Sequence, residues 1–148
     1  MKKQNNHFSR LLARAGGWWL GRAARRTEVS APAYQSTLDA RTALRLERWV
    51  SERGYCRPDM GMEAVAESLG ISKEQLSYYC RAVLGLNFLS WRKQLRMREA
   101  QRLLASSPGL SVLLVSEMVG VSDKSNFKRQ FYEVCGCTPA QWVAQQRR

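Results

Sequence analysis

The sequence is poor in the residues that hold metals. It has one histidine, His7, and its four cysteines include no C-x-x-C pair. A structural zinc site needs four such ligands at familiar spacings, so we predict neither a metal nor a cofactor. Cys80 falls on an apolar helical face, and Cys135 and Cys137 are interpreted as reduced, structural residues.

Long hydrophobic runs are absent as well. No segment approaches the ~20 apolar residues of a membrane-spanning helix, and the stretch from Leu11 to Leu20 is interrupted by Arg14 and by glycines, unlike a signal peptide. After the N-terminal region we find no histidine, no glycine-rich phosphate loop and no paired carboxylates, which are common components of catalytic sites. We therefore expect a cytoplasmic protein that is not an enzyme.

Acidic residues are scarce relative to basic ones. The 148 residues include 24 lysines and arginines against 12 aspartates and glutamates, a formal net charge of +12. Residues 1–38 hold 7 basic and 1 acidic residue, and residues 39–148 hold 17 and 11, so each part carries +6. The later, more hydrophobic part is basic by itself, which favours an acidic polymer or an anionic membrane as partner.

What the sequence does contain is an internal repeat. The octapeptide VAESLGIS at 65–72 returns as VSEMVGVS at 115–122, with four identical positions. Gly70 and Gly120 suit a sharp turn, and Ser72 and Ser122 suit the cap of a following helix. Each copy has the pattern of a helix-turn-helix.

The repeat continues when one extra residue is allowed in the second copy. The further aligned pairs are Gly85/Gly136, Asn87/Thr138 and Trp91/Trp142. In each copy the glycine can end the second helix, and the Asn or Thr can cap the next one. Two copies with matching turns, ends and following tryptophans indicate two helix-turn-helix modules that read DNA.

Hydrophobic periodicity gives the extent of the predicted elements. The expected helices before the second copy lie at 37–53, 62–69, 72–84 and 87–105. The last of these would be about 28 Å long, and its apolar face rotates between Trp91 and Met97. We predict an all-α, homeodomain-like fold of about seven helices, with two helix-turn-helix subdomains joined by this long linker helix. Recognition helices in successive major grooves lie about 34 Å apart, a separation compatible with such a linker.

The expected domain organisation has four parts: a basic arm or linker at 1–36, motif one at 37–86, the linker helix at 87–106 and motif two at 107–148. In the arm, Trp18 and Trp19 lie near Arg22, Arg25 and Arg26. This combination suits a membrane surface or DNA phosphates, but we prefer the simpler interpretation of a flexible basic arm.

The second helix of each motif has a buried and an outward side. The outward positions are Glu74, Ser77, Tyr78 and Arg81 in motif one and Lys124, Ser125, Lys128, Arg129 and Tyr132 in motif two. We predict that all of them except Tyr132 contact DNA. Lysine and arginine suit guanine N7 and O6, glutamate suits the cytosine amino group, and tyrosine suits the thymine methyl. Contacts of Lys124 or Lys128 to phosphates remain an alternative. Arg81, Arg92, Lys93 and Arg96 are better suited to the DNA backbone or to intramolecular ion pairs than to base reading.

These residues resemble the AraC/XylS family of bacterial transcription regulators from about Leu44 to Trp142. The matching segments are Val65-Ala66…Leu69-Gly70-Ile71-Ser72, Gly85-Leu86…Phe88…Trp91, Leu95-Arg96…Ala100…Leu103-Leu104, Val119-Gly120-Val121-Ser122-Asp123…Phe127…Phe131 and Gly136-Cys137-Thr138-Pro139…Trp142. The resemblance implies a seven-helix pair of helix-turn-helix modules that binds double-stranded DNA beside a promoter and activates transcription through RNA polymerase. It also implies that the outward positions at the start of each second helix face base edges.

Three positions depart from the family pattern. Val121 replaces the usual Phe, and Ser116 replaces the usual small Ala and needs a local hydrogen bond if it is buried. Leu113 and Leu114 stand where polar residues are usual; they form either a partner surface, for polymerase or a missing domain, or a local packing surface. No small-molecule site is visible, and a sensor or dimerisation domain like that of many family members is not recognised, so the chain is a stand-alone regulator or a fragment.

The predicted function is therefore a sequence-specific DNA-binding transcription regulator, an activator, that reads an asymmetric site with two unlike recognition helices in successive major grooves. One alternative is a protein-interaction regulator of the same fold with weak DNA binding, which the acidic Glu74 permits. A second alternative is an alkyl-accepting cysteine at Cys135 or Cys137.

Overall fold

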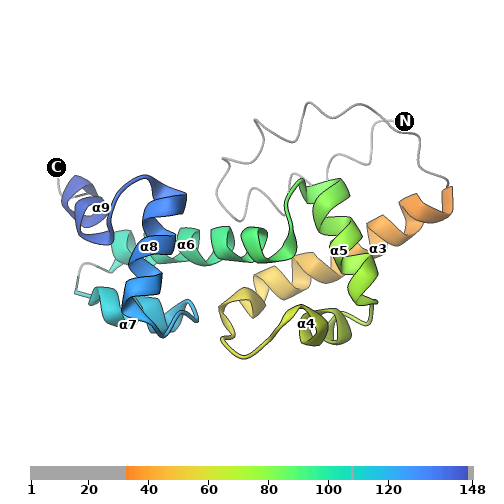
Figure 1. The fold of residues 1–148 in the computed structure, drawn as a ribbon, viewed down its shortest axis with the longest axis horizontal. Helices are drawn as coiled ribbons and strands as arrows, with labels where there is room; N and C mark the ends of the chain where they lie inside the picture. The colour runs from red at the N-terminus through yellow and green to blue at the C-terminus, as the bar shows by residue number, and fades with distance from the viewer. Residues whose placement is uncertain (1–32, 108, 147–148) are drawn as a thin grey trace. The chain divides into compact units, whose positions relative to one another are not determined.

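A computed structural model describes residues 33–107 and 109–146, which form an all-helical fold without a strand in these ranges (Figure 1). The α-helices are α3 (Ala33–Ser51), α4 (Met62–Ser68), α5 (Lys73–Tyr79), α6 (Phe88–Ser106), α7 (Val112–Met118), α8 (Lys124–Cys135) and α9 (Pro139–Gln146). A 3-10 turn, η1 (Gly54–Cys56), follows α3, and a π-helical turn, η2 (Cys80–Leu84), extends α5. The predicted fold class and the seven helices are confirmed. No helix in the described part of the chain is long and apolar enough to span a membrane.

The chain divides into two compact units. Of the described residues, the first unit contains 33–54 and 60–91, and the second contains 55–59, 92–107 and 109–146. Helix α6 starts in the first unit and continues into the second. Each unit holds one copy of the repeat.

Helix boundaries follow the predictions closely, with one shift at the start. Helix α3 begins at Ala33 rather than Thr37, so the last four residues of the predicted arm are helical, and it ends at Ser51 rather than Arg53. Arg53 has a φ of 57°, which stops the helix before Gly54. The rest of the arm, including Trp18 and Trp19, lies outside the described residues.

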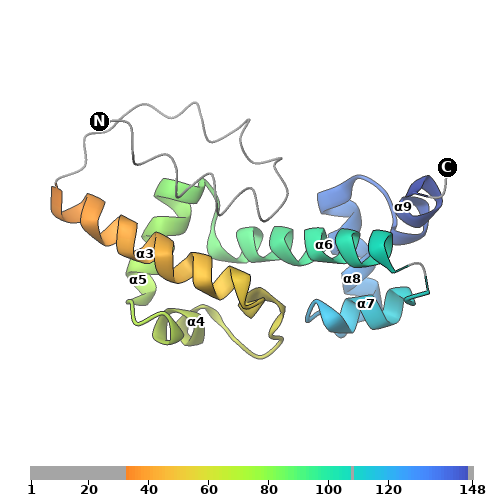
Figure 2. The ribbon, with the colours of Figure 1, turned by 180° about the vertical axis from the view of Figure 1, so that it is seen from behind.

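Helix α5 packs against α3 in the first unit, and the two helices cross in Figures 1 and 2. Trp49 of α3 stacks on Trp91 of α6, with ring centroids 6.0 Å apart, and Phe88 lies 6.2 Å from Trp49. Leu76 and Cys80 from the second helix of the motif are fully buried. This face of α5 and η2 is the apolar one that periodicity predicted.

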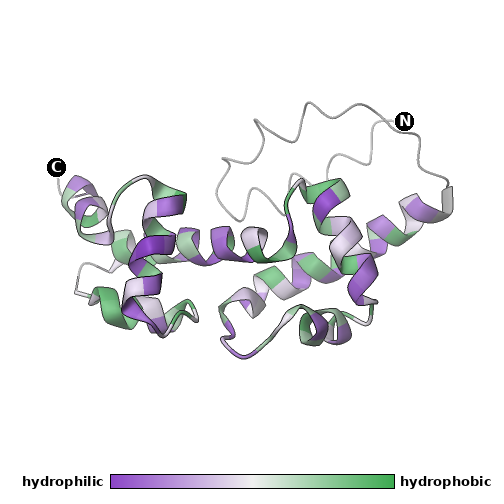
Figure 3. Cartoon of the chain, in the orientation of Figure 1, coloured by the Kyte–Doolittle hydropathy of each residue, from purple (hydrophilic) through white to green (hydrophobic). Residues whose placement is uncertain are grey.

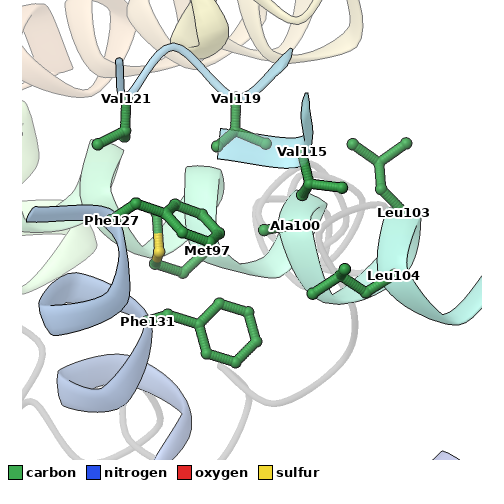
Figure 4. Packing of buried hydrophobic residues seen from close by; sticks show 9 residues of the cluster. All are labelled: Met97, Ala100, Leu103, Leu104, Val115, Val119, Val121, Phe127 and Phe131. Carbon is green, nitrogen blue, oxygen red and sulfur yellow. The ribbon is translucent and has the colours of Figure 1, made fainter. Parts of the chain in front are cut away.

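The core of the second unit gathers side chains from α6, α7 and α8 (Figure 4). Phe127 and Phe131 project from α8 toward Met97 and Ala100 of α6, and their rings lie 5.8 Å apart. Trp91 packs in the first unit and Met97 in the second. The predicted rotation of the apolar face along this helix is therefore confirmed.

Candidate nucleic-acid interface

The two helix-turn-helix turns are closed by the same backbone hydrogen bonds. In each copy the amides of the turn glycine and of the next residue donate to carbonyls of the preceding helix. These bonds are Gly70 to Glu67 (2.9 Å) and Ile71 to Ala66 (3.1 Å), and Gly120 to Glu117 (3.0 Å) and Val121 to Ser116 (2.9 Å). Both glycines have a left-handed backbone, with φ of 63° and 79°, which only glycine adopts without strain. The repeat in the sequence is thus a repeat of turn geometry.

The caps of the second helices differ between the copies. Ser72 caps α5, since its side chain accepts a hydrogen bond from the amide of Gln75 at 3.0 Å. In the second copy Asp123, not Ser122, caps α8 by accepting from the amide of Asn126. The prediction for Ser122 was wrong because Ser122 is the extra residue of the second copy and lies inside the turn, while Asp123 takes the position of Ser72.

The departures from the family pattern in the second turn fit its packing. Ser116 is fully buried, and its hydroxyl donates to the Leu113 carbonyl at 2.7 Å, the local bond that burial requires. Val121 is also buried in the second core. The turn therefore tolerates both residues without leaving a polar side chain unsatisfied at Ser116.

Once the extra residue is placed in the turn, the second helices align over their whole length with an offset of 51. Helix α5 with η2 covers 73–84, and α8 covers 124–135. Their stops also match, because Gly85 and Gly136 both have left-handed φ values, 75° and 73°. Leu76 and Phe127 are the equivalent buried residues, so the two outward faces can be compared position by position.

The outward face of α5 is polar and of mixed charge. Glu74, Tyr78 and Arg81 are exposed, and Ser77 is half-buried. Lys73, at the first position, forms an ion pair with Glu63 of α4, and the hydrogen bond from Lys73 lowers the pKa of the Glu63 carboxyl. This face therefore offers hydrogen-bonding groups with little positive charge.

The outward face of α8 is basic. Lys124, Ser125, Lys128 and Arg129 are all exposed, and the side of α8 seen in Figure 3 is mainly hydrophilic. Guanidinium and ammonium groups suit phosphate oxygens and the acceptors of guanine. The two faces thus keep the difference in charge that the sequence predicted.

Two residues at outward positions were not among the predicted contacts. Lys73 is equivalent to Lys124 under the offset of 51, and Tyr132 is equivalent to Arg81. Tyr132 is 58% exposed, and its hydroxyl is a group that commonly contacts phosphates. Periodicity had already placed Tyr132 on the outward side, and the offset of 51 is the signal that could have added both residues to the predicted contacts. The predicted contact residues are accessible to DNA. Their contacts with DNA are still a prediction.

The basic residues of α6 bind the protein itself. Arg92 and Arg96 both donate from Nε to the Tyr55 carbonyl, at 3.1 and 2.6 Å, and from Nη2 to the Arg57 carbonyl. Burial lowers the pKa of Arg92 to about 10. Lys93 forms an ion pair with Glu133 at 2.8 Å. Lys93 thus makes an intramolecular ion pair, one of the two roles expected for these residues, whereas Arg92 and Arg96 bind carbonyls rather than carboxylates.

These two arginines hold the segment Tyr55–Asp59 against the turn of motif two. A Cβ built on Gly120 would lie 2.1 Å from the Cys56 carbonyl oxygen, so this carbonyl packs directly on the turn glycine. In motif one, Arg45 of α3 supports the equivalent turn by donating to the Gly70 carbonyl at 2.7 Å. Each reading helix therefore follows a turn that is fixed by contacts from elsewhere in its own unit.

The cysteines considered as alkyl acceptors lie beside the second core. Cys135 and Cys137 are half-buried against it, and burial raises the pKa of Cys135 to about 12. The buried Cys80 has a pKa of about 12 for the same reason. A reactive cysteine needs its thiolate, so Cys135 is poorly suited to accept alkyl groups.

We expect Cys80 and Cys135 to resist alkylation by iodoacetamide at pH 8 in the folded protein. Raising a thiol pKa from 9.0 to about 12 lowers the thiolate fraction roughly a thousandfold. Peptide mass spectrometry after timed labelling measures the rates, with the denatured protein as control. Native labelling of Cys135 at the denatured rate would contradict this expectation and would support an alkyl-acceptor role.

The fold and the two exposed faces define a double helix-turn-helix protein of the DNA-binding class. A helix-turn-helix domain family matches residues 65–145. The chain is 33% identical over 81 residues to the arabinose operon regulatory proteins of Salmonella typhimurium and Escherichia coli, which covers 55% of this chain but only 28% and 27% of those proteins. The chain belongs to the AraC/XylS family of helix-turn-helix DNA-binding transcription regulators.

Solved structures agree with this assignment. The C-terminal domain of the response regulator yesN from Fusobacterium nucleatum has a TM-score of 0.60 and 27% identity, covering 68% of this chain and 97% of that domain. The C-terminal domain of AraT from Geobacillus stearothermophilus has a TM-score of 0.62 and 25% identity, covering 80% and 88%. The DNA-binding domain of AdpA, solved with a target DNA, is similar in fold (TM-score 0.63, 24% identity, covering 72% and 92%).

Proposed function

We propose that one copy of this protein reads an asymmetric DNA site by inserting α5 and α8 into successive major grooves of one duplex. The observation that carries this proposal is the unlike chemistry of two equivalent outward faces. At the aligned positions Ser77 and Lys128, and Tyr78 and Arg129, one helix presents neutral groups and the other presents cations. Two faces that prefer different bases require a site without two-fold symmetry.

The direct test is selection of bound duplexes from a random-sequence pool, followed by mobility shifts. The proposal predicts enriched sites of about two helical turns with two unlike halves. A control pool carrying the selected site with its halves inverted relative to one another should bind less tightly. A palindromic consensus would contradict reading by a single copy. Failure to retain any duplex at low salt would instead favour the protein-interaction alternative.

We further propose that the protein acts as an activator in the cytoplasm and contacts RNA polymerase through α7. Leu113 and Leu114 at the start of this helix are 46% and 44% exposed, so both keep accessible apolar surface after packing in their own unit. Val112 and Val115, on the opposite side, pack in or against the second core. Apolar side chains left exposed beside a DNA-reading helix are suited to a protein partner.

Replacing Leu114 with Glu should abolish activation and leave folding and DNA affinity unchanged, because the side chain is exposed and lies outside the reading face. Promoter-driven transcription in vitro and mobility shifts measure the two activities separately. Leu44→Glu is the matched control, since Leu44 is 53% exposed on α3. Equal activation by the two variants would exclude α7 as the polymerase contact.

A further inference from the structure

A half-buried amide on the reading helix of motif two connects two of its neighbours. The side-chain oxygen of Asn126 accepts a hydrogen bond from Nη2 of Arg129 at 2.9 Å and another from Nε2 of Gln130 at 3.1 Å. The backbone amide of the same residue is fixed by the cap of Asp123. Asn126 is therefore held at its main chain while its side chain accepts from the guanidinium.

The equivalent residue of motif one, Gln75, contacts a different helix instead of an outward arginine. Gln75 aligns with Asn126 under the offset of 51, and its side chain is directed to Thr42 of α3, with Nε2 3.5 Å from the hydroxyl oxygen. Its neighbour at the position of Arg129 is Tyr78, which has no guanidinium to orient. Of the two second helices, only α8 therefore has a side-chain amide in contact with an outward arginine.

We infer that Asn126 is a positioning residue that sets the base specificity of Arg129, an inference that rests on the proposed reading of DNA by α8. An arginine has several rotatable bonds, and ordering it on binding carries an entropic cost. The contact to Asn126 uses one of the two N–H groups of Nη2. The other N–H of Nη2 and its neighbour on the same edge of the guanidinium keep one two-donor edge available for a bidentate contact with the O6 and N7 atoms of a guanine. We therefore expect Arg129, oriented by Asn126, to contact one guanine in the half-site that α8 reads.

The consequence can be tested with Asn126→Leu, which keeps the shape and removes the acceptor. Losing one orienting hydrogen bond should weaken binding to the selected site about 2- to 12-fold, with the loss confined to sites that carry the guanine. In an Arg129→Ala background the same change should have no further effect. Asn126→Asp, which retains the acceptor, should restore the preference, and Gln130→Leu should leave it unchanged.

Two results would overturn the inference. One is an equal loss from Asn126→Leu with and without Arg129, and the other is a uniform loss over all sites. Side-chain 15N relaxation of Arg129 in the free protein supplies a readout without DNA, because Asn126→Leu should raise the mobility of Nε. Unchanged mobility would overturn the orienting contact even if DNA binding is confirmed, whereas a wild-type protein that retains no duplex would overturn the proposed function instead.

Discussion

Gly120→Ala should destabilise the protein by about 2–5 kcal/mol, more than any other single glycine-to-alanine change in a turn of the repeat. Part of the loss is the left-handed backbone at φ 79°, which costs roughly 1–2 kcal/mol for a residue with a Cβ. The rest arises because the new Cβ would meet the Cys56 carbonyl oxygen at 2.1 Å. That carbonyl belongs to the backbone of a segment that Arg92 and Arg96 hold in place. Moving it away from the new Cβ should therefore cost about 1–3 kcal/mol in overpacking strain.

The repeat supplies a matched control for this prediction. Gly70 occupies the same place in motif one with a φ of 63°, but a Cβ there would first meet the end of the flexible Arg45 side chain, at 3.4 Å. Gly70→Ala should therefore lower the free energy of unfolding only by the cost of the left-handed backbone, about 1–2 kcal/mol. Chemical denaturation followed by circular dichroism and tryptophan fluorescence measures both variants. Equal losses would show that the segment Tyr55–Asp59 does not restrain the second turn.

The turns and helix ends were predictable because each depends on one residue type at one position. Glycines at 70, 85, 120 and 136 are the four glycines with positive φ in the described ranges, and all four had been assigned to turns or helix ends. The cap of α8 was predicted wrongly, since an ungapped alignment of the octapeptides carries Ser122 onto Ser72. Only the geometry shows that Asp123 takes the place of Ser72 at the cap, which leaves Ser122 as the extra residue of the turn.

The segment at 55–59 shows what local patterns cannot predict. It lies between the helices predicted at 37–53 and 62–69, inside the range predicted for motif one, yet it belongs to the second unit. Its contacts come from Arg92 and Arg96, 37 and 41 residues away from Tyr55. Helical periodicity identified which side chains are outward, but it carries no information about pairs such as Asn126 and Arg129, because these depend on side-chain rotamers.

Removing the positive charges of α8 should cause the largest loss of DNA affinity. The variant Lys124→Ala/Lys128→Ala/Arg129→Ala should bind its selected site roughly 10²–10⁴-fold more weakly near 0.1 M salt, whether each side chain contacts a base or a phosphate. All three side chains are exposed, so the melting temperature should change little. Mobility shifts at several salt concentrations, with circular dichroism as the folding control, give both quantities.

A triple variant on the outward face of α5, Glu74→Ala/Ser77→Ala/Tyr78→Ala, distinguishes charge from base reading. It removes no cation, so the slope of log affinity against log salt should stay as in the wild type, and base preference should relax in one half of the site. The α8 variant should instead reduce the slope by about 0.9 for each of its side chains that contacts a phosphate. A side chain that reads a base leaves the slope unchanged and relaxes preference at one base pair. Similar salt slopes and similar losses of affinity in the two variants would contradict unequal readers, because the outward faces of α5 and α8 differ chiefly in their positive charge.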